Sequence, residues 1–232
     1  MLSVDSKQVN NKCIISADFT TNCPRRRNGT PCKYCYVESS RNNKWNPKPI
    51  SDYLPYTGWV KRIRNHTKFK LKKAGGLRLF SYGDYMPEHD KDIILFLDDC
   101  SKYNVDVKVI TKQRDFIKKY HNHPAIKVIH ISIDNLKENG SHVSHKSARF
   151  YRNKYKKVLV RSVACNWDDV NKFGKAKWCD IITLNHKIIP GKRFHLFSKN
   201  ERKEANNIYP GKICCITNHC NTCKIKCRKN KE

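Results

Sequence analysis

The sequence lacks any long apolar run. Its longest apolar stretches, such as Ile93–Leu97, are far shorter than the roughly 20 residues that a membrane-spanning helix needs. No apolar segment follows a basic start, so the sequence predicts no signal peptide. We therefore expect a soluble, cytoplasmic protein that has no membrane partner and keeps its cysteines reduced.

Acidic residues are also scarce. The chain has 20 Asp and Glu against 48 Lys and Arg, a formal net charge of +28 at pH 7. Such an excess of positive charges causes mutual repulsion within the protein and favours binding to a polyanionic partner. The interleaved Tyr, Phe and Trp side chains are suited to stacking on bases. A codon bias towards Lys and Asn in an AT-rich genome is the alternative explanation. The charge nevertheless favours a nucleic acid, RNA or DNA, as the partner.

Cysteine, by contrast, is abundant, with 12 in 232 residues. In a chain without a signal peptide, clustered cysteines indicate metal ligands rather than disulfides. Four isolated cysteines in apolar segments are better explained as core residues: Cys13, Cys100, Cys165 and Cys179. The other eight fall into two clusters, one near each end of the chain.

The N-terminal cluster consists of Cys23, Cys32 and Cys35, spaced C-x8-C-x2-C, with Tyr34 directly before the last cysteine. Three thiolates on one loop can hold three irons of a [4Fe–4S] cluster and leave the fourth iron open. An open iron can bind a small molecule and pass it an electron. This loop is the predicted seat of catalysis.

The C-terminal cluster offers five thiolates. Four suffice for a second [4Fe–4S] cluster or for a tetrahedral zinc ion. We predict Cys215, Cys220, Cys223 and Cys227 as the ligands, with Cys214 as the alternate. Spacing alone does not decide between iron–sulfur and zinc.

Between the clusters, strand-like and helix-like segments alternate. The predicted strands are 13–19, 77–82, 105–110, 126–133, 157–164 and 180–184, and the predicted helices include 51–72, 87–103, 113–121 and 144–155. This alternation predicts an α/β fold, an open partial (β/α)6 TIM-like barrel. We assign residues 1–198 to the barrel and residues 199–232 to a cysteine-rich, metal-binding tail whose first segment is a polar helix or linker.

Polar residues recur where the predicted strands end. Asp84 follows the second strand, Lys112 the third and Asn166 the fifth, while Ser132 lies at the end of the fourth. Ligands of such folds gather at the carboxyl ends of the strands. The sequence therefore predicts that these residues and the cysteine loop meet at one end of the barrel.

The phrase Cys32-Lys33-Tyr34-Cys35 resembles the second half of the C-x3-C-x-aromatic-C signature of the radical S-adenosylmethionine superfamily, although the first gap is eight residues here. Ser81-Tyr82-Gly83-Asp84 stands where that family often has a Gly-Gly-Glu-like motif. Val109-Ile110-Thr111-Lys112 is similar to a "TK" phrase of its spore-photoproduct-lyase-like and phage-encoded branches. The matches span roughly residues 13–185, and the likeness is greatest to a divergent phage-type branch.

The resemblance implies a role for each matching residue. Cys23, Cys32 and Cys35 would hold the cluster, and Tyr34 would pack near the adenine of S-adenosylmethionine. The Gly83 backbone and Asp84 would hold the methionyl amino group, and Lys112 belongs to the matching phrase. Ser132 and Arg149 would contact ribose or carboxylate, and Asn166 the adenosyl group. The implied reaction is reductive cleavage to a 5′-deoxyadenosyl radical, with electrons from a donor such as flavodoxin or ferredoxin.

Three hypotheses follow. The first is a radical S-adenosylmethionine enzyme that modifies or repairs a nucleic acid. The second is a non-enzymatic, zinc-dependent nucleic-acid-binding protein, although the large α/β middle exceeds what a zinc module needs. The third is a radical enzyme acting on a peptide or small molecule, which the charge of +28 disfavours.

Overall fold

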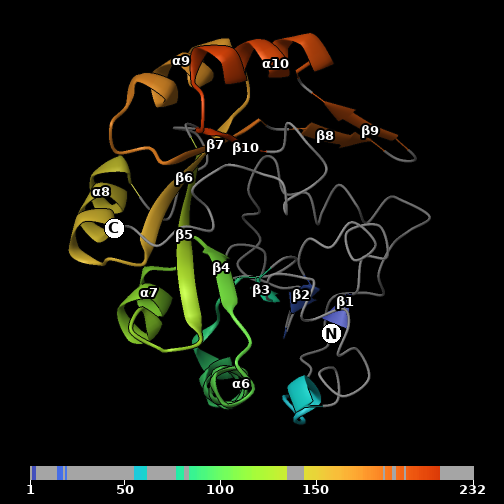
Figure 1. Ribbon diagram of the computed structural model, residues 1–232, viewed down its shortest axis with the longest axis vertical. Coiled ribbons are helices and arrows are strands. Elements are labelled where there is room, and N and C mark those ends of the chain that lie inside the picture. The colour runs from blue at the N-terminus through green and yellow to red at the C-terminus, as the bar shows by residue number, and fades with distance from the viewer. Residues whose placement is uncertain are drawn as a thin grey trace.

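The computed structural model describes residues 2–3, 15–17, 19, 55–61, 77–80, 84–134, 144–184, 186–189, 192–195 and 197–214 of the chain. It shows an α/β fold built on one sheet, whose strands are ordered β1-β2-β3-β4-β5-β6-β7-β10 (Figure 1). The strands are β1 (Leu2–Ser3), β2 (Ile15–Ala17), β3 (Leu77–Leu79), β4 (Val107–Thr111), β5 (Ile126–Asp134), β6 (Val158–Ala164), β7 (Ile181–Leu184) and β10 (Ile213–Cys214).

The six strands predicted from the sequence, β2 to β7, are confirmed. They are parallel and neighbour one another in chain order. β1 adds an antiparallel edge beside β2, and β10 adds a parallel strand beside β7. A separate hairpin pairs β8 (His186–Ile189) with β9 (Lys192–His195). The sequence analysis missed β1, β10 and this hairpin.

Helices connect the strands on one side of the sheet. They are η1 (Pro87–His89), α6 (Asp90–Lys102), α7 (Arg114–Tyr120), α8 (His145–Lys154), α9 (Trp167–Lys175) and α10 (Lys199–Ile208). From β2 to β7, each strand joins the sheet next to the preceding strand and always in the same direction across the sheet. Right-handed crossovers therefore place all the connecting helices on one face. The result is a curled half-barrel with these helices outside (Figure 1). We call the helix-covered side the outer face and the opposite side the inner face.

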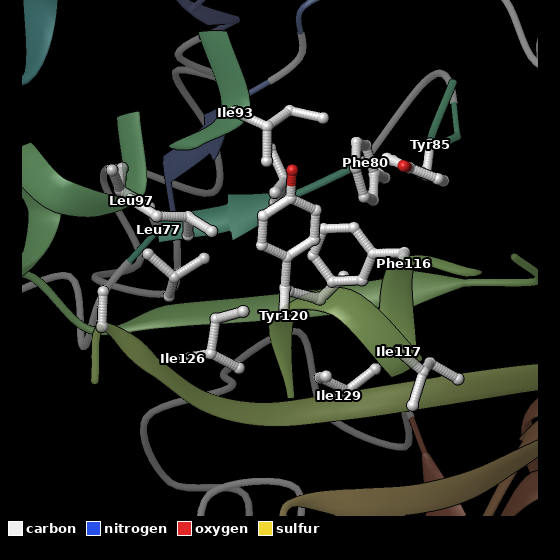
Figure 2. Packing of buried hydrophobic residues seen from close by; sticks show 14 of the residues in the cluster. Leu77, Phe80, Tyr85, Ile93, Leu97, Phe116, Ile117, Tyr120, Ile126 and Ile129 are labelled. Carbon is white, nitrogen blue, oxygen red and sulfur yellow. The ribbon is translucent and has the colours of Figure 1, made fainter. Parts of the chain in front are cut away.

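The main core lies between the outer face and the helices. Leu77 of β3 and Ile129 of β5 pack with Ile93 of α6 and Phe116 of α7, and all four are fully buried (Figure 2). Along β4 the outward residues are buried while Lys108 and Ile110 are half-buried, the alternation expected when a strand's two faces differ. Burial of large side chains contributes about 1.5–3 kcal/mol each, so this layer dominates the stability of the fold.

One carboxylate ties α6 to its neighbours. Asp90 begins α6 and accepts hydrogen bonds from the hydroxyl groups of Tyr85 (2.8 Å) and Tyr120 (2.5 Å), and it pairs with Lys119. Burial raises the pKa of Asp90, but the bonds from Lys119, Tyr120 and Tyr85 outweigh it and leave that pKa below its usual value. Since these donors come from α7 and from the segment before η1, Asp90 fixes the loop after β3.

The predicted helices 87–103, 113–121 and 144–155 are confirmed. Of the predicted helix 51–72, residues 59–61 are helical and the other described residues, 55–58, precede them; the remainder lies outside the described residues. Cys100 and Cys179 are buried, as predicted, whereas Cys165 is only half-buried. No helix in the described part of the chain is long and apolar enough to cross a membrane.

The sheet continues past the boundary placed at residue 198. α10 begins with a capping box formed by Ser198 and Glu201, and β10 then joins the sheet. Lys212 donates to the carbonyl oxygens of Gly174 (2.7 Å) and Ala176 (2.9 Å), so its ammonium group satisfies the C-terminal end of α9. These contacts join residues 212–214 to the half-barrel across the predicted boundary.

Candidate active site at the carboxyl edge of the sheet

The carboxyl ends of β3 to β6 lie at one edge of the sheet, because these strands are parallel neighbours. Asp84 lies between β3 and η1, and Lys112 directly follows β4. Ser132 is two residues before the end of β5, and Asn166 follows β6 at the start of α9. This edge is where ligands of α/β sheets gather. The structure thus brings four predicted site residues to one edge.

Asp84 is held by three donors. Its Oδ1 accepts hydrogen bonds from the Thr111 hydroxyl (2.5 Å) and from the backbone N–H of Tyr85 (2.8 Å). Its Oδ2 accepts from the backbone N–H of Lys112 (3.0 Å). The carboxylate therefore links the loop after β3 to the end of β4, in a single orientation.

These bonds and burial act on Asp84 in opposite directions. Burial raises the pKa of Asp84, and the hydrogen bonds from Thr111, Lys112 and Tyr85 lower it, with a net rise above the usual value. A carboxylate oxygen offers two lone pairs, and Oδ2 accepts only one bond from the described residues. Among the described residues, Oδ2 thus keeps one unused acceptor position, which suits a ligand that donates a hydrogen bond, such as an ammonium group.

The Thr111-Lys112 pair contributes differently from the prediction, which named Lys112. The Thr111 hydroxyl is buried, donates to Asp84, and accepts from the backbone N–H of Gln113 (2.9 Å). Lys112 supplies its backbone N–H to Asp84, and its charge lowers the pKa of that carboxyl. Thr111 therefore connects the start of α7 to the carboxylate, a role that the sequence signalled only by a hydroxyl at a strand end.

Asn166 and Arg149 lie in other surroundings. Asn166 is the N-cap of α9, and its Oδ1 accepts from the backbone N–H of Asp169 (2.8 Å). Arg149 lies in the middle of α8 on its exposed side, whereas Ala148 and Tyr151 are buried. Neither side chain is hydrogen-bonded to Asp84 in the described part of the chain. Both assignments remain predictions.

Ser132 faces the interior of the half-barrel. It is 9% exposed and pairs in register with Arg161 of β6. The Arg161 guanidinium donates to the Thr183 hydroxyl (2.7 Å) and to Cys214 Sγ (3.4 Å). Cys214, the alternate ligand of the C-terminal cluster, is therefore anchored to the sheet on β10. The sequence analysis missed Arg161, because a basic residue in a strand gives no sign of which face it occupies.

The remaining predicted site residues lie outside the described residues: Cys23, Cys32, Tyr34, Cys35, Gly83, Cys215, Cys220, Cys223 and Cys227. In chain order, the N-terminal cysteines fall between β2, which ends at Ala17, and β3, which begins at Leu77. The C-terminal cysteines follow β10 directly. Within the described ranges, no group of three or more His, Cys, Asp or Glu side chains is placed to hold a metal ion.

Charge is unevenly distributed over the outer helices. α6 contains four aspartates, whereas α8 contains none and no glutamate. On the exposed side of α8, Phe150 is 55% exposed and is flanked by Arg149 and Lys154, whose Nζ lies 5.4 Å from the ring centroid. An exposed aromatic ring among cations is the combination that single-stranded nucleic acids bind.

No protein-family model matches the chain, and no curated protein matches it either.

Proposed function

We propose that this protein is a radical S-adenosylmethionine enzyme that modifies or repairs a nucleic acid. Asp84 carries the proposal, because its carboxylate is preoriented at the carboxyl edge and keeps an acceptor position. The segment with Cys23, Cys32 and Cys35 connects β2 to β3, so it starts at the same edge. Six parallel strands in chain order support a TIM-like (β/α)6 barrel, and the cysteines that follow β10 in the sequence are the basis for proposing a metal-binding tail.

The donor set fits the proposed cofactors. Soft thiolates from Cys23, Cys32 and Cys35 suit a [4Fe–4S] cluster. Oδ2 of Asp84 suits the ammonium group of S-adenosylmethionine, since a carboxylate and an ammonium form a charge-assisted hydrogen bond. When bound, these groups supply one-electron cleavage of a sulfonium and a primary carbon radical that abstracts hydrogen from an unactivated carbon.

The chain's own residues prepare the site. Thr111 and the backbone N–H groups of Tyr85 and Lys112 hold Asp84 in one rotamer, so orienting the ligand costs little reorganisation. Asp84 acts as an orienting group and not as an acid–base catalyst.

A nucleic-acid substrate is supported by charge and by the exposed face of α8. The chain carries +28, and α8 presents Phe150 among basic side chains without an acidic residue. Phosphates contact cations and unstacked bases stack on aromatic rings, so this face suits single-stranded or loop regions.

The first test is anaerobic purification of the full chain, followed by visible absorbance and iron and sulfide counts. Absorbance at about 400 nm indicates iron–sulfur clusters; about eight irons mean two clusters, and about four mean one cluster with zinc or nothing in the tail. A colourless protein that holds only zinc after cluster reconstitution contradicts the proposal and favours the non-enzymatic, zinc-dependent nucleic-acid-binding protein.

Two variants test the site. Cys32→Ala should abolish 5′-deoxyadenosine formation from S-adenosylmethionine, whereas Cys165→Ala, at a half-buried cysteine outside the predicted ligand sets, should retain it. Asp84→Asn should weaken S-adenosylmethionine binding about 10- to 100-fold, as expected for losing a charge-assisted hydrogen bond of about 1.5–3 kcal/mol. Asp168→Asn, at an exposed carboxylate of α9, is the matched control.

The substrate class is tested by binding of tRNA and duplex DNA at increasing salt. Phosphate contacts weaken steeply with salt, so a nucleic-acid enzyme should show a strong salt dependence. Binding that is indifferent to salt would redirect the proposal to a peptide or small-molecule substrate.

A further inference from the structure

The inner face of the half-barrel carries a basic cluster that the edge chemistry does not use. Its members are Arg78 of β3, Lys108 of β4, His130 of β5 and Arg161 of β6. Arg78 pairs in register with Lys108, whose partner on β5 is Val128, two residues before His130. Arg161 pairs with Ser132, two residues after His130. Registered pairs share a face and neighbouring strands lie about 4.8 Å apart, so these side chains form one cluster around His130.

Three nitrogen atoms of this cluster are buried without a hydrogen-bond partner in the described part of the chain. They are Nε of Arg78 and both ring nitrogens, Nδ1 and Nε2, of His130. His130 is only 5% exposed. A buried polar group without a partner costs about 1–3 kcal/mol, and native structures rarely keep one without a reason. Three such atoms, on the two strands that flank β4, point to a ligand.

The surroundings of His130 are positive. Burial lowers the pKa of His130 well below its usual value, and the charges of Arg161, Arg78 and Lys108 lower it further. Strands β3, β4, β6 and β7 contain no acidic residue, and β5 contains only Asp134 at its end. The imidazole is therefore neutral and offers one N–H donor and one acceptor nitrogen.

We propose that this inner-face cluster, Arg78, Lys108, His130 and Arg161, binds a phosphate group. A tetrahedral dianion presents oxygens in several directions, which suits donors on separate strands better than a planar carboxylate does. Bound beside His130, it draws a proton onto the imidazole, so that both ring nitrogens become donors and all three unpartnered atoms are satisfied. A divalent metal ion, which a neutral histidine often binds, is disfavoured here by the three neighbouring cations.

The phosphate site is distinct from the carboxyl edge. His130 pairs with Ile110, one residue before Thr111, so its side chain lies on the face of the sheet opposite to that of Thr111, the donor to Asp84. The unpartnered atoms belong to Arg78 and His130, and neither residue is part of the Asp84 site. It stands whether or not the edge supports radical chemistry.

The test is thermal unfolding of the full chain at fixed ionic strength, in inorganic phosphate, AMP, adenosine or chloride. Phosphate or AMP should raise Tm in a saturable way, while chloride and adenosine should not. An equal response to both phosphates indicates a site for free phosphate, and a stronger response to AMP indicates a nucleotide phosphate. The proposal is overturned if adenosine or chloride raises Tm as much as phosphate does.

Variants separate this site from the general attraction of a basic protein for anions. Arg78→Met and His130→Leu should each weaken phosphate binding at least 10-fold. Without phosphate both should be as stable as the parent or more stable, because each removes an unsatisfied buried group. Lys175→Gln, at an exposed cation of α9, is the charge-matched control and should keep the full response. Retention of the response in both cluster variants overturns the proposal.

A second measurement uses the parent protein and does not depend on whether a variant folds. The imidazole nitrogen resonances of His130 in the labelled parent protein, followed by NMR at neutral pH, should move from the neutral to the protonated pattern as phosphate is added. Resonances that stay neutral at saturating phosphate overturn the proposal.

Discussion

Removal of one hydroxyl group tests how the candidate site is built. Thr111→Val keeps the shape of the side chain and deletes the donor to Asp84 and the acceptor for the Gln113 N–H. Thr111 is 1% exposed, so water does not replace the lost partner. A hydrogen bond to a charged group contributes about 1.5–3 kcal/mol, and the orphaned N–H adds to the loss. We expect the free energy of unfolding to fall by about 2–4 kcal/mol.

The assay is urea unfolding from about pH 8 to about pH 4. The hydroxyl donates to the ionised carboxylate, so its removal raises the pKa of Asp84 above the already raised parental value. The stability deficit of Thr111→Val should therefore be full above that pKa and shrink as the pH falls through it. Thr111→Ser keeps the hydroxyl and should keep the parental pH dependence, apart from a constant loss for the missing methyl group.

Two results refute this reasoning. A deficit below about 0.5 kcal/mol, with the urea m-value unchanged, means that the hydroxyl does not hold an ionised Asp84. A deficit of full size that is independent of pH means that the loss comes from packing or from the Gln113 N–H alone.

Two further substitutions test the fold around the site. Gly174→Ala places a Cβ 2.4–2.5 Å from ring carbons of Tyr209, so we expect a loss of about 1–3 kcal/mol in urea unfolding as the ring is displaced from α9. Arg152→Gln removes the bidentate hydrogen bonds to Asp180 (2.7 and 2.8 Å), and the free energy of unfolding should fall by about 2–3 kcal/mol. Arg149→Gln, on the exposed side of the same helix, should change that free energy by less than about 0.5 kcal/mol. Equal losses in the two arginine variants would contradict the assignment of Arg152 as the buried partner.

The periodicity of the chain predicted the central strands and helices because local pattern and tertiary environment agree there. In β4, for example, alternate residues are apolar and buried against α6 and α7. The short strands gave no such signal. Ile213–Cys214 is too short to show alternation, and its pairing with β7 is accompanied by long-range contacts of Lys212 and Tyr209 with α9.

The sequence predicted where the candidate site lies in the fold, but it predicted only some of the groups that form it. Asp84 and Lys112 stand at strand ends in the sequence, and parallel pairing brings those ends together. The sequence did not show that Thr111 supplies the side-chain donor while Lys112 contributes its backbone N–H, because that depends on which groups face each other across two loops. Arg78 and His130 were missed for the same reason: whether a polar residue in a strand meets water or a neighbour depends on what covers that face.

The sequence by itself determined the class of fold and the chemistry available. Residue periodicity sets helix and strand through local backbone preferences, and the thiol and charge content set the ligands and partners that the chain can attract. Only the tertiary structure decided which groups meet: the three donors around Asp84 and the unpartnered nitrogens of the inner face. Hydrogen bonds and desolvation act over a few ångströms, so they depend on neighbours that chain order alone does not specify.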